Sequence, residues 1–406
     1  MIEEEYSYIT ALDVELKEED QAEIGFILPH EHIFQNLSQF ADQNLVDLDS
    51  ISLLNIQQIR EQPFRCNRNL NLDSVEEMHF EMQELISHPI YKNRKPLIVE
   101  ATNNQNGQDY AKLKELAKLL KINLVKGFTF GKDLSKIDLN DEKTKVLFSS
   151  QNILNQVDFE FELGTNEQKP SYIGEIELSE LNLESNLIHQ NALIAYLHIS
   201  KVKKVPIIFN LKNQPTPNIE KLISQMKPEH IGRIVLFNPQ FQYEEKRLVI
   251  EKENEQNLTL VKQIKNFKEI LNLLNQKFII GFDILRYDYN DLVDITKLLL
   301  QKGYSKQILI SNGVKYRTDL RKYGGKGFFA VFDFIKDTQM NDQQIEDIFR
   351  NNMIAVLQWN TFKVQIQEIK QWKCPICGKE QPENIQRFTK LGKEFCSIAC
   401  LKKAVF

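Results

Sequence analysis

The sequence predicts an α/β fold, a closed (β/α)8 TIM barrel over residues 1–365 followed by a small zinc-binding module over residues 366–406. Three observations predict this fold. Short apolar runs recur eight times, segments of helical period lie between most of them, and four of the five cysteines lie beyond residue 373. A chain of 406 residues is long enough for one large domain and one small one.

The apolar runs predict the strands of the barrel. Each run is bounded by turn or charged residues and is apolar at successive positions, which is typical of strands buried on both faces of a parallel sheet. The runs are Ile24–Leu28, Leu97–Glu100, Leu124–Phe128, Tyr172–Ile176, Val205–Phe209, Ile234–Phe237, Phe278–Phe282 and Ile308–Ile310.

The segments between the runs predict helices. In residues 110–121, leucines at four positions fall on one helical face: Leu113, Leu116, Leu119 and Leu120. Three further segments behave likewise: Asn186–Ser200, Asn218–Met226 and Leu292–Lys302. Because alternating strands and helices need crossover connections, the sheet is expected to be parallel.

A doubly wound open sheet is the alternative arrangement for the same alternation. That fold usually has a glycine-rich turn after its first strand. The corresponding stretch here, Leu28-Pro29-His30-Glu31-His32, contains no glycine. The sequence therefore favours the barrel and leaves the open sheet as the second choice.

Polar residues follow nearly every predicted strand. They are His30 and His32, Glu100, Glu175, Asn210, Asn238, Asp283, and Asn312 with Gly313. Active sites of (β/α)8 barrels lie at the carboxyl ends of the strands. Strands must end in something polar, which explains one or two of these residues, but a His-x-His pair together with Glu175 is more specific.

The His-x-His pair predicts a metal site. Alternate residues of an extended strand point the same way, so His30 and His32 can reach one cation. The same pair on a solvent-facing strand would be ordinary, and its place after the first predicted strand is what favours ligation.

The cysteines near the end of the chain predict a second, structural metal site. Cys374 and Cys377 form one close pair, and Cys396 and Cys400 form another after 18 intervening residues. Four thiolates in two pairs suit a closed tetrahedral Zn²⁺ site. A module this small has almost no apolar core, so the metal would supply its folding energy.

Four longer stretches carry a resemblance to a known family. They are ALDVELKEEDQAEIGFILPHEHIF, PLIVEATNNQNGQDYAKLKELAKLLKINLVKGF, YIGEIELSELNLES and ILISNGVKYRTDLRKYGGKGF. Between about residue 8 and about residue 362, the chain resembles the phosphotriesterase-related family of amidohydrolase-type, metal-dependent barrels. Near the end, FCSIACLKKAVF resembles the second half of FCS- and YHS-type treble-clef-like fingers.

The resemblance implies a two-metal hydrolase whose ligands are only partly present here. His30 and His32 match the first histidine pair, and Glu175 matches the bridging carboxylate. The resemblance thus implies a three-ligand set that can hold one Zn²⁺ and leave a fourth position open. The three remaining ligand positions, two histidines and an aspartate, fall on Asn210, Asn238 and Gly313. Amide side chains are poor ligands for a Zn²⁺-type ion, and glycine has no side chain to ligate or to take a proton.

Two functions are compatible with this mixed ligand set. The first is a catalytically degenerate barrel, a pseudoenzyme that serves as a scaffold or docking subunit of a larger protein assembly. The alternative is a mononuclear zinc hydrolase acting on an ester, lactone or amide-type substrate. It would need a general base, for which Asp283 and Glu100 are the remaining candidates, although a structural role for both carboxylates, as partners of Lys, Arg or backbone in the barrel mouth, is favoured over a catalytic one.

Composition limits the choice of partners. The net charge of −5 gives no basic footprint for nucleic acid, and no apolar stretch is long enough to span a membrane. The charged run Glu244–Glu255 is interpreted as a solvated helix face. We expect protein partners, bound through the finger or the barrel surface. The expected location is the cytoplasm, with the cytoskeleton or a cilium left open.

Overall fold

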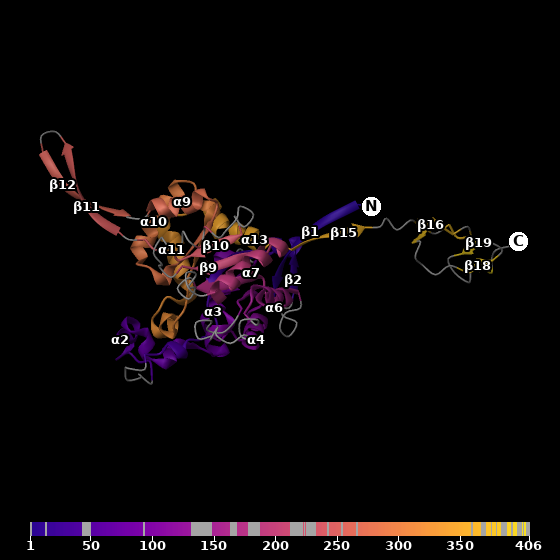
Figure 1. Cartoon of the computed structure of the whole chain (residues 1–406), viewed down its shortest axis with the longest axis horizontal. Helices are drawn as coiled ribbons and strands as arrows, with labels where there is room; N and C mark the ends of the chain where they lie inside the picture. The colour runs from indigo at the N-terminus through magenta and orange to yellow at the C-terminus, as the bar shows by residue number, and fades with distance from the viewer. Residues whose placement is uncertain are drawn as a thin grey trace. The chain divides into compact units, whose positions relative to one another are not determined.

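The computed structural model describes most of the chain and divides it into two compact units. It describes residues 2–402 except 13, 43–49, 92–93, 131–147, 163–168, 178–186, 212–221, 223, 225–232, 242, 253–254, 265–266, 359, 367–370, 375, 379, 383–387, 391–392, 396–399 and 401. Ser7–Asn360 form one unit, and Met1–Tyr6 with Thr361–Phe406 form the other (Figure 1).

An eight-stranded parallel sheet forms the centre of the larger unit. In chain order its strands are β3 (Ile24–Glu31), β6 (Lys95–Glu100), β7 (Asn123–Phe128), β8 (Tyr172–Glu177), β9 (Ile207–Asn210), β10 (Ile234–Phe237), β13 (Ile279–Asp283) and β14 (Ile308–Ser311). Their order in the sheet is β14-β13-β10-β9-β8-β7-β6-β3. All eight predicted strands are confirmed.

The two edge strands of this sheet meet, so the sheet curls into a nearly closed barrel. The backbone N–H of His30 on β3 donates to Ser311 Oγ on β14 over 3.0 Å. Sequence order equals spatial order around the barrel, with no strand inserted out of turn. The barrel prediction is confirmed, and the open doubly wound sheet is excluded.

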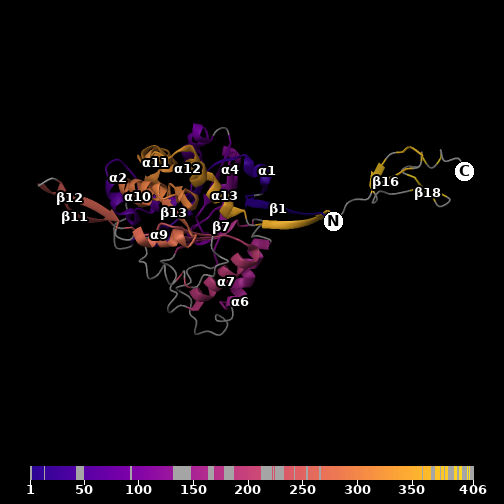
Figure 2. The same cartoon turned by 90° about the horizontal axis from the view of Figure 1, so that it is seen from above.

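Helices surround the barrel and fill the connections between strands. They are α2 (Ile56–Glu61), α3 (Val75–Ile86), α4 (Tyr110–Leu120), α6 (Ser150–Glu162), α7 (Leu187–Lys203), α9 (Phe267–Asn275), α10 (Tyr289–Gln301), α11 (Ala330–Thr338), α12 (Asp342–Glu346) and α13 (Asn352–Leu357). Helices α6 and α7 lie side by side on one flank (Figure 2). The predicted helices at 110–121, 186–200 and 292–302 are confirmed, whereas most of 218–226 lies outside the described residues.

The side chains of two aspartates cap the N-termini of two of these helices. Asp109 accepts a hydrogen bond from Lys112 N at the start of α4, and Asp288 accepts one from Asp291 N at the start of α10. Such N-caps satisfy backbone donors that a helix leaves unpaired. No helix among the described residues is both long enough and apolar enough to cross a membrane.

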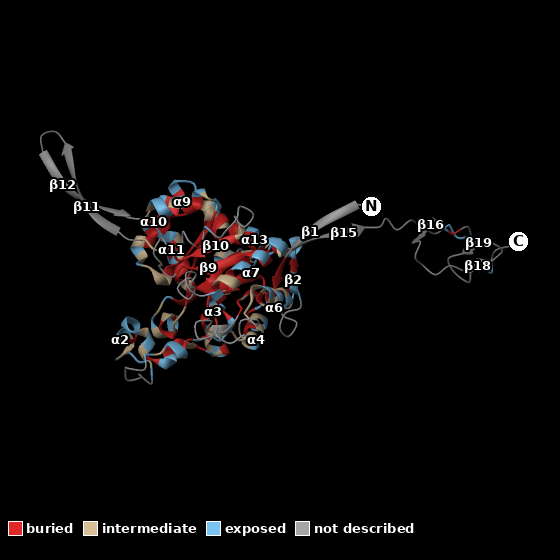
Figure 3. Cartoon of the chain, in the orientation of Figure 1, coloured by how far each residue is buried: buried red, intermediate tan, exposed pale blue. Residues whose placement is uncertain are grey.

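The strands separate two layers of buried side chains. Leu97 and Val99 of β6 pack in the cluster inside the barrel, while Ile98 between them packs outward with helix residues such as Leu113. Figure 3 shows the same arrangement, with buried strands inside and exposed helix surfaces outside. Phe237 belongs to the inner cluster and lies directly beneath the polar residues at the strand exits.

Short elements complete the larger unit. β2 (Val14–Lys17) pairs antiparallel with β1 (Ile2–Ala11), and α1 (Glu18–Ala22) follows it. β4 (Gln35–Asn36) pairs antiparallel with β5 (Asn71–Leu72). A π-helical turn at Asp347–Asn351 joins α12 to α13.

A long hairpin replaces the helix expected in the charged run 244–255. β11 (Tyr243–Lys252) and β12 (Glu255–Ile264) pair antiparallel over ten residues each and project from the barrel between β10 and α9 (Figures 1 and 2). The helical interpretation is therefore wrong. The charges alone suggested a solvated helix. The run also contains the apolar stretch Leu248-Val249-Ile250, and the segment after it contains Leu258-Thr259-Leu260-Val261, and both stretches favour β-strands.

The smaller unit consists of short strands. β15 (Asn360–Ile366) lies beside β1. β16 (Gln371–Lys373) pairs with β17 (Glu380–Pro382), and β18 (Phe388–Lys390) pairs with β19 (Lys393–Phe395), both antiparallel. Two small hairpins suit a zinc-binding module, and the boundary between residues 365 and 366 stays a prediction.

Candidate metal centre

Three of the predicted ligand residues converge at the carboxyl ends of β3 and β8. His30 Nε2 and His32 Nε2 each lie 3.5 Å from Glu175 Oε2. All three residues are buried, and their ligand atoms lie within 4.8 Å of one another. Nitrogen and oxygen ligands about 2.0–2.1 Å from a tetrahedral zinc ion are roughly 3.3–3.4 Å apart. The spacing to Glu175 therefore fits a single ion.

The second ring nitrogen of each histidine has its own partner. His30 Nδ1 donates to Asp283, 2.9 Å from Oδ2 and 3.1 Å from Oδ1. His32 Nδ1 lies 3.1 Å from Thr102 Oγ1. In metal sites such contacts fix the orientation of the ring and direct the other nitrogen to the metal. Here both Nε2 atoms are directed toward Glu175.

A buried nitrogen at the centre of this group supports the fit to a cation. His30 Nε2 is buried and makes no hydrogen bond within the normal distance range among the described residues, its contact with Glu175 Oε2 being 3.5 Å long. Buried polar atoms normally have a partner, and an orphaned one points to an ion or water that completes it. A divalent cation between His30, His32 and Glu175 would supply that partner.

The electrostatics of the group also favour a positive charge. Burial lowers the pKa of His30, but the carboxylates of Asp283 and Glu175 outweigh burial and raise it to about 10. Burial lowers the pKa of His32 to about 3, so this ring is neutral and can ligate. Burial would raise the pKa of Glu175, yet the charge of His30 holds it below its ordinary value. Two buried carboxylates thus need either a proton on His30 or a cation.

The two asparagines at the later strand exits connect the carboxylates to each other. Asn210 Nδ2 donates to Glu175 Oε1, and Asn238 Nδ2 donates to Asp283 Oδ2 over 2.7 Å. Asn238 Nδ2 also lies 3.3 Å from Asn210 Oδ1. Asn238 has a φ of 56°, a left-handed conformation that asparagine tolerates better than most residues. Both amides therefore hold the site together, where the resemblance implies histidine ligands.

Asp283 occupies the space that a side chain at position 313 would need. A Cβ atom on Gly313 would lie 2.4 Å from Asp283 Cβ and 2.6 Å from Asp283 Cγ. The carboxylate of β13 thus occupies the room in which a side chain at the end of β14 would stand. From there it orients His30.

Both candidate bases make structural contacts. Glu100 Oε2 accepts from Ile33 N over 2.8 Å and Oε1 accepts from Thr102 N over 3.1 Å, which holds the segments after β3 and β6 together. Burial raises the pKa of Glu100 to about 8. Asp283 bonds to His30 and Asn238, so a structural role accounts for the contacts of both carboxylates.

Sequence reasoning missed Glu31 and the pair Lys315–Glu177. Glu31, between the two histidines, accepts hydrogen bonds from Ser311 at the end of β14 and from Asn312 directly after it. Lys315 Nζ lies 3.6 Å from Glu177 Oε1, near Glu175. The i, i+2 spacing of Glu175 and Glu177 on one strand was a signal that could have found the second carboxylate.

The cysteines of the smaller unit form a separate cluster. Sulfur atoms of Cys374, Cys377 and Cys400 lie within 4.8 Å of one another and could hold a metal. Gly378 has a φ of 71° and its N–H donates to Cys374 O over 2.9 Å, which makes the tight turn around the first pair. Cys396 lies outside the described residues. The structural zinc at this cluster stays a prediction.

Comparisons with known proteins agree with the barrel. No model of a known protein family matches the chain. N-acetyltaurine hydrolase from Salmo salar is 24% identical over 373 residues, which cover 84% of this chain and 95% of that protein. A resiniferatoxin-binding protein from Rhodobacter sphaeroides is similar in structure, with a TM-score of 0.65, 17% identity and coverage of 86% of this chain and 95% of that one.

Two further solved structures match to a similar degree. The phosphotriesterase homology protein from Escherichia coli has a TM-score of 0.59 and 16% identity, covering 82% of this chain and 99% of that one. A lactonase from Listeria monocytogenes has a TM-score of 0.58 and 14% identity, covering 87% and 99%. The likeness to phosphotriesterase-related and amidohydrolase-type barrels is confirmed at the level of the fold.

Proposed function

The chain has the phosphotriesterase-type barrel fold, and we propose on this premise that the protein is a mononuclear metal-dependent hydrolase acting on an ester, lactone or amide-type substrate. One observation carries the proposal. The Nε2 atoms of His30 and His32 converge on Glu175 Oε2 at 3.5 Å, while each Nδ1 is held by a partner of its own. A degenerate site would have no need to keep both rings in this orientation.

The residues of the chain would divide the work as follows. His30, His32 and Glu175 would hold one divalent ion, which when bound supplies a Lewis acid and lowers the pKa of water. Asp283 orients His30, and Asn210 fixes the second oxygen of Glu175. Lys315, close to Glu177, brings a positive charge toward this group. Of the three substrate classes, an amide agrees best with the name of the Salmo salar relative.

The scaffold function remains the second candidate, because three observations favour it. The amides of Asn210 and Asn238 stand where histidine ligands would be, Gly313 has no side chain, and Asp283 and Glu100 make structural contacts. In this interpretation the barrel is a pseudoenzyme, and the cysteine cluster is a zinc-dependent module that docks a protein partner, with no role for nucleic acid or membrane.

Counting bound metal separates the two candidates. The full-length protein is expected to bind two metal ions, one in the barrel and one at the cysteines. His30→Gln should lower the count to one, and so should Cys374→Ser, when metal content is measured by mass spectrometry after dialysis. His198→Gln, on the outer helix α7, is the matched control and should leave the count at two. A count of one in the full-length protein that is unchanged in His30→Gln and falls to zero in Cys374→Ser would mean that the barrel holds no metal, and a count that stays at two in His30→Gln would exclude His30 as a required ligand.

Turnover tests the reaction itself. The metal-loaded protein is expected to hydrolyse at least one member of a panel of N-acetylated amines, lactones and simple esters. His32→Gln should lower kcat/KM by at least about 100-fold, because the ligand set would lose one of its three donors. The measurement is product release under saturating metal. If a metal-loaded barrel hydrolyses none of the panel, the scaffold function is favoured.

A further inference from the structure

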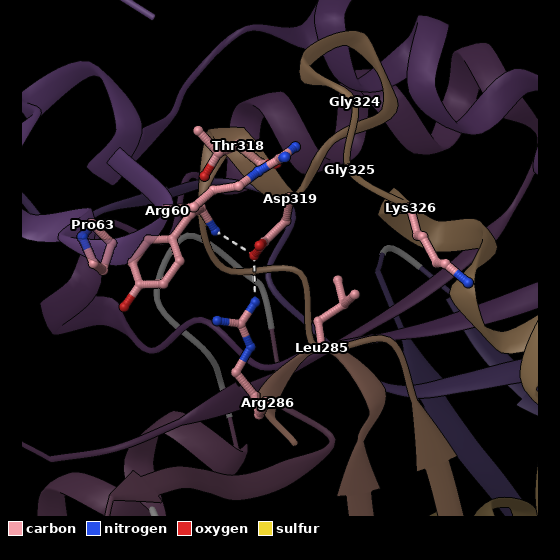
Figure 4. A pocket seen from close by; sticks show the side chains of 10 residues that line it. Arg60, Pro63, Leu285, Arg286, Thr318, Asp319, Gly324, Gly325 and Lys326 are labelled. Atoms are coloured by element: carbon pink, nitrogen blue, oxygen red, sulfur yellow. Dashed lines mark hydrogen bonds and ion pairs between the residues drawn. The ribbon is translucent and has the colours of Figure 1, made fainter. Parts of the chain in front are cut away.

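A pocket of about 320 Å³ lies over the carboxyl ends of β13 and β14 (Figure 4). Its walls come from α2 and the turn after it, from the turn after β13, and from the segment that follows β14. The lining includes three basic residues, Arg60, Arg286 and Lys326, and one acidic residue, Asp319. Nothing in the metal centre or the proposed reaction uses these four side chains.

The single carboxylate of the pocket already has a full set of partners. Asp319 Oδ2 accepts from the backbone N–H groups of Lys315 and Tyr316, each over 2.9 Å. The same oxygen forms an ion pair with Arg286 Nη2, as Figure 4 shows. Arg286 Nε donates to Gly313 O over 3.1 Å, and its guanidinium lies 5.3 Å from the centre of the Tyr316 ring. Arg286 is therefore fixed in place.

Within the described part of the chain, the charge of Arg60 has no such counterpart. Its Nη2 donates to Tyr323 O over 2.8 Å and to Thr318 O over 3.5 Å, and these carbonyls orient the guanidinium without neutralising it. Among the residues that the structure describes, no carboxylate pairs with Arg60. A guanidinium has five N–H donors, so Arg60 keeps donors for a ligand.

The balance of charge in the pocket is positive. Lys326 forms an ion pair with Asp333 over 2.8 Å, and half of its side chain is exposed, so it contributes little. Arg286 is matched by Asp319, whereas Arg60, which is also exposed, has no paired carboxylate among the described residues. The rest of the wall includes apolar surface from Pro63, Leu285 and Tyr316. A ligand that fits this wall has one oxyanion and a small apolar body.

We propose that this pocket binds a small organic oxyanion, a compact carboxylate, sulfonate or phosphate ester, with Arg60 as its principal ligand and Arg286 as its second. The volume lies at the small end of the range for ligand pockets, about 300–1,000 Å³. Planar, bidentate guanidinium groups suit all three kinds of oxyanion.

The pocket also lies next to the metal centre. Arg286 donates to the carbonyl of Gly313, and the other side of Gly313 packs on Asp283, which orients His30. This step rests on the proposed hydrolase function: in such an enzyme, the pocket would select substrates that carry an acidic group. The binding of the oxyanion itself does not depend on hydrolysis.

Direct titration tests the pocket. The probes are acetate, methanesulfonate and methyl phosphate, added to the full-length protein and followed by calorimetry at low salt. At least one probe is expected to bind at one site per chain, and Arg60→Met should weaken its binding by about tenfold or more. Arg286→Lys, which keeps a charge beside Asp319, should weaken it less. Arg68→Met, an exposed arginine outside the pocket, is the control and should change nothing.

The outcomes separate the pocket from the proposed hydrolase. His32→Gln should bind the probe as well as the unchanged protein does, because none of the three barrel ligands is among the residues that line the pocket. If turnover is found, Arg60→Met should raise KM for an acidic substrate and leave kcat within about twofold. Failure of all three probes to bind at millimolar concentration, or equal binding by Arg60→Met, would overturn the inference.

Discussion

Gly313→Asp is expected to lower the free energy of unfolding by about 2–4 kcal/mol, although the resemblance implies an aspartate at this position. The new Cβ would lie 2.4 Å from Asp283 Cβ, a distance that real Cβ contacts do not reach. Gly313 also has a φ of 67°, which L side chains rarely adopt. Urea unfolding of the two proteins measures the difference.

Two further variants separate the contact from the backbone strain. Gly303 has a φ of 84°, and a Cβ there would meet nothing within 4 Å. Gly303→Asp should therefore cost only about 1 kcal/mol. Adding Asp283→Gly to Gly313→Asp should recover part of the lost stability, because it removes the Cβ atom that the new side chain would meet at 2.4 Å. If Gly313→Asp costs no more than Gly303→Asp, the packing argument fails.

This competition bears directly on the function. A two-metal site needs the aspartate after the last strand, and here the carboxylate from β13 fills its place and holds His30 Nδ1. Asn210 and Asn238 extend the same hydrogen-bonded chain from Glu175 to Asp283. The losses at the three positions are thus coupled through contacts, which supports a site rebuilt for one ion more than a site that decayed position by position.

The barrel could be predicted from sequence because its strands are buried on both faces. Runs such as Ile234–Phe237 are apolar at every position, which in a chain of this composition is typical of a strand covered on both sides. The ends of the strands could be predicted as well, because a polar residue appears where each apolar run stops. His30 stands near the end of β3, and Glu175 stands near the end of β8. The hairpin β11–β12 was missed because charged residues flank its apolar ones. The charges favour a solvated helix, whereas the apolar residues favour strands.

The contacts within the site could not be predicted from sequence. The approach of Asp283 to Gly313 depends on the stagger between β13 and β14, in which Asp283 is level with Ser311. A stagger of one residue would turn the carboxylate to the other face. The pocket with Arg60 was equally hidden, because Arg60 and Arg286 are far apart in the chain and meet only across the barrel mouth.

The second large effect is expected at Glu31, where Glu31→Ala should lower the free energy of unfolding by about 3–5 kcal/mol. Glu31 is fully buried, and its Oε1 accepts from Ser311 Oγ (2.8 Å), Asn312 N (2.8 Å) and Asn312 Nδ2 (2.9 Å). Its Oε2 accepts from Val314 N over 3.2 Å. Burial raises the pKa of Glu31 to about 7, and the hydrogen bonds from Asn312 and Ser311 favour the carboxylate.

The reason for the size of this effect is the place of Glu31 in the barrel. It joins β3 to β14, the first strand to the last, so its loss leaves buried donors unpaired along the closing edge. Urea unfolding measures the change. Glu115→Ala, an exposed glutamate on α4, is the control and should stay within about 0.5 kcal/mol.

Glu31→Gln distinguishes a structural role from a wider one. The amide keeps the shape of the side chain but directs N–H donors at other donors, so the expected cost is about 1–3 kcal/mol. Ser311 Oγ donates to Glu31 and accepts from His30 N, so the same substitution should also shift His30 and weaken metal binding in the barrel. A destabilised protein with unchanged metal affinity would show that Glu31 closes the barrel without positioning the site. A protein with unchanged stability would contradict the closing role, because the buried donors on β14 and after it cannot lose their carboxylate without cost.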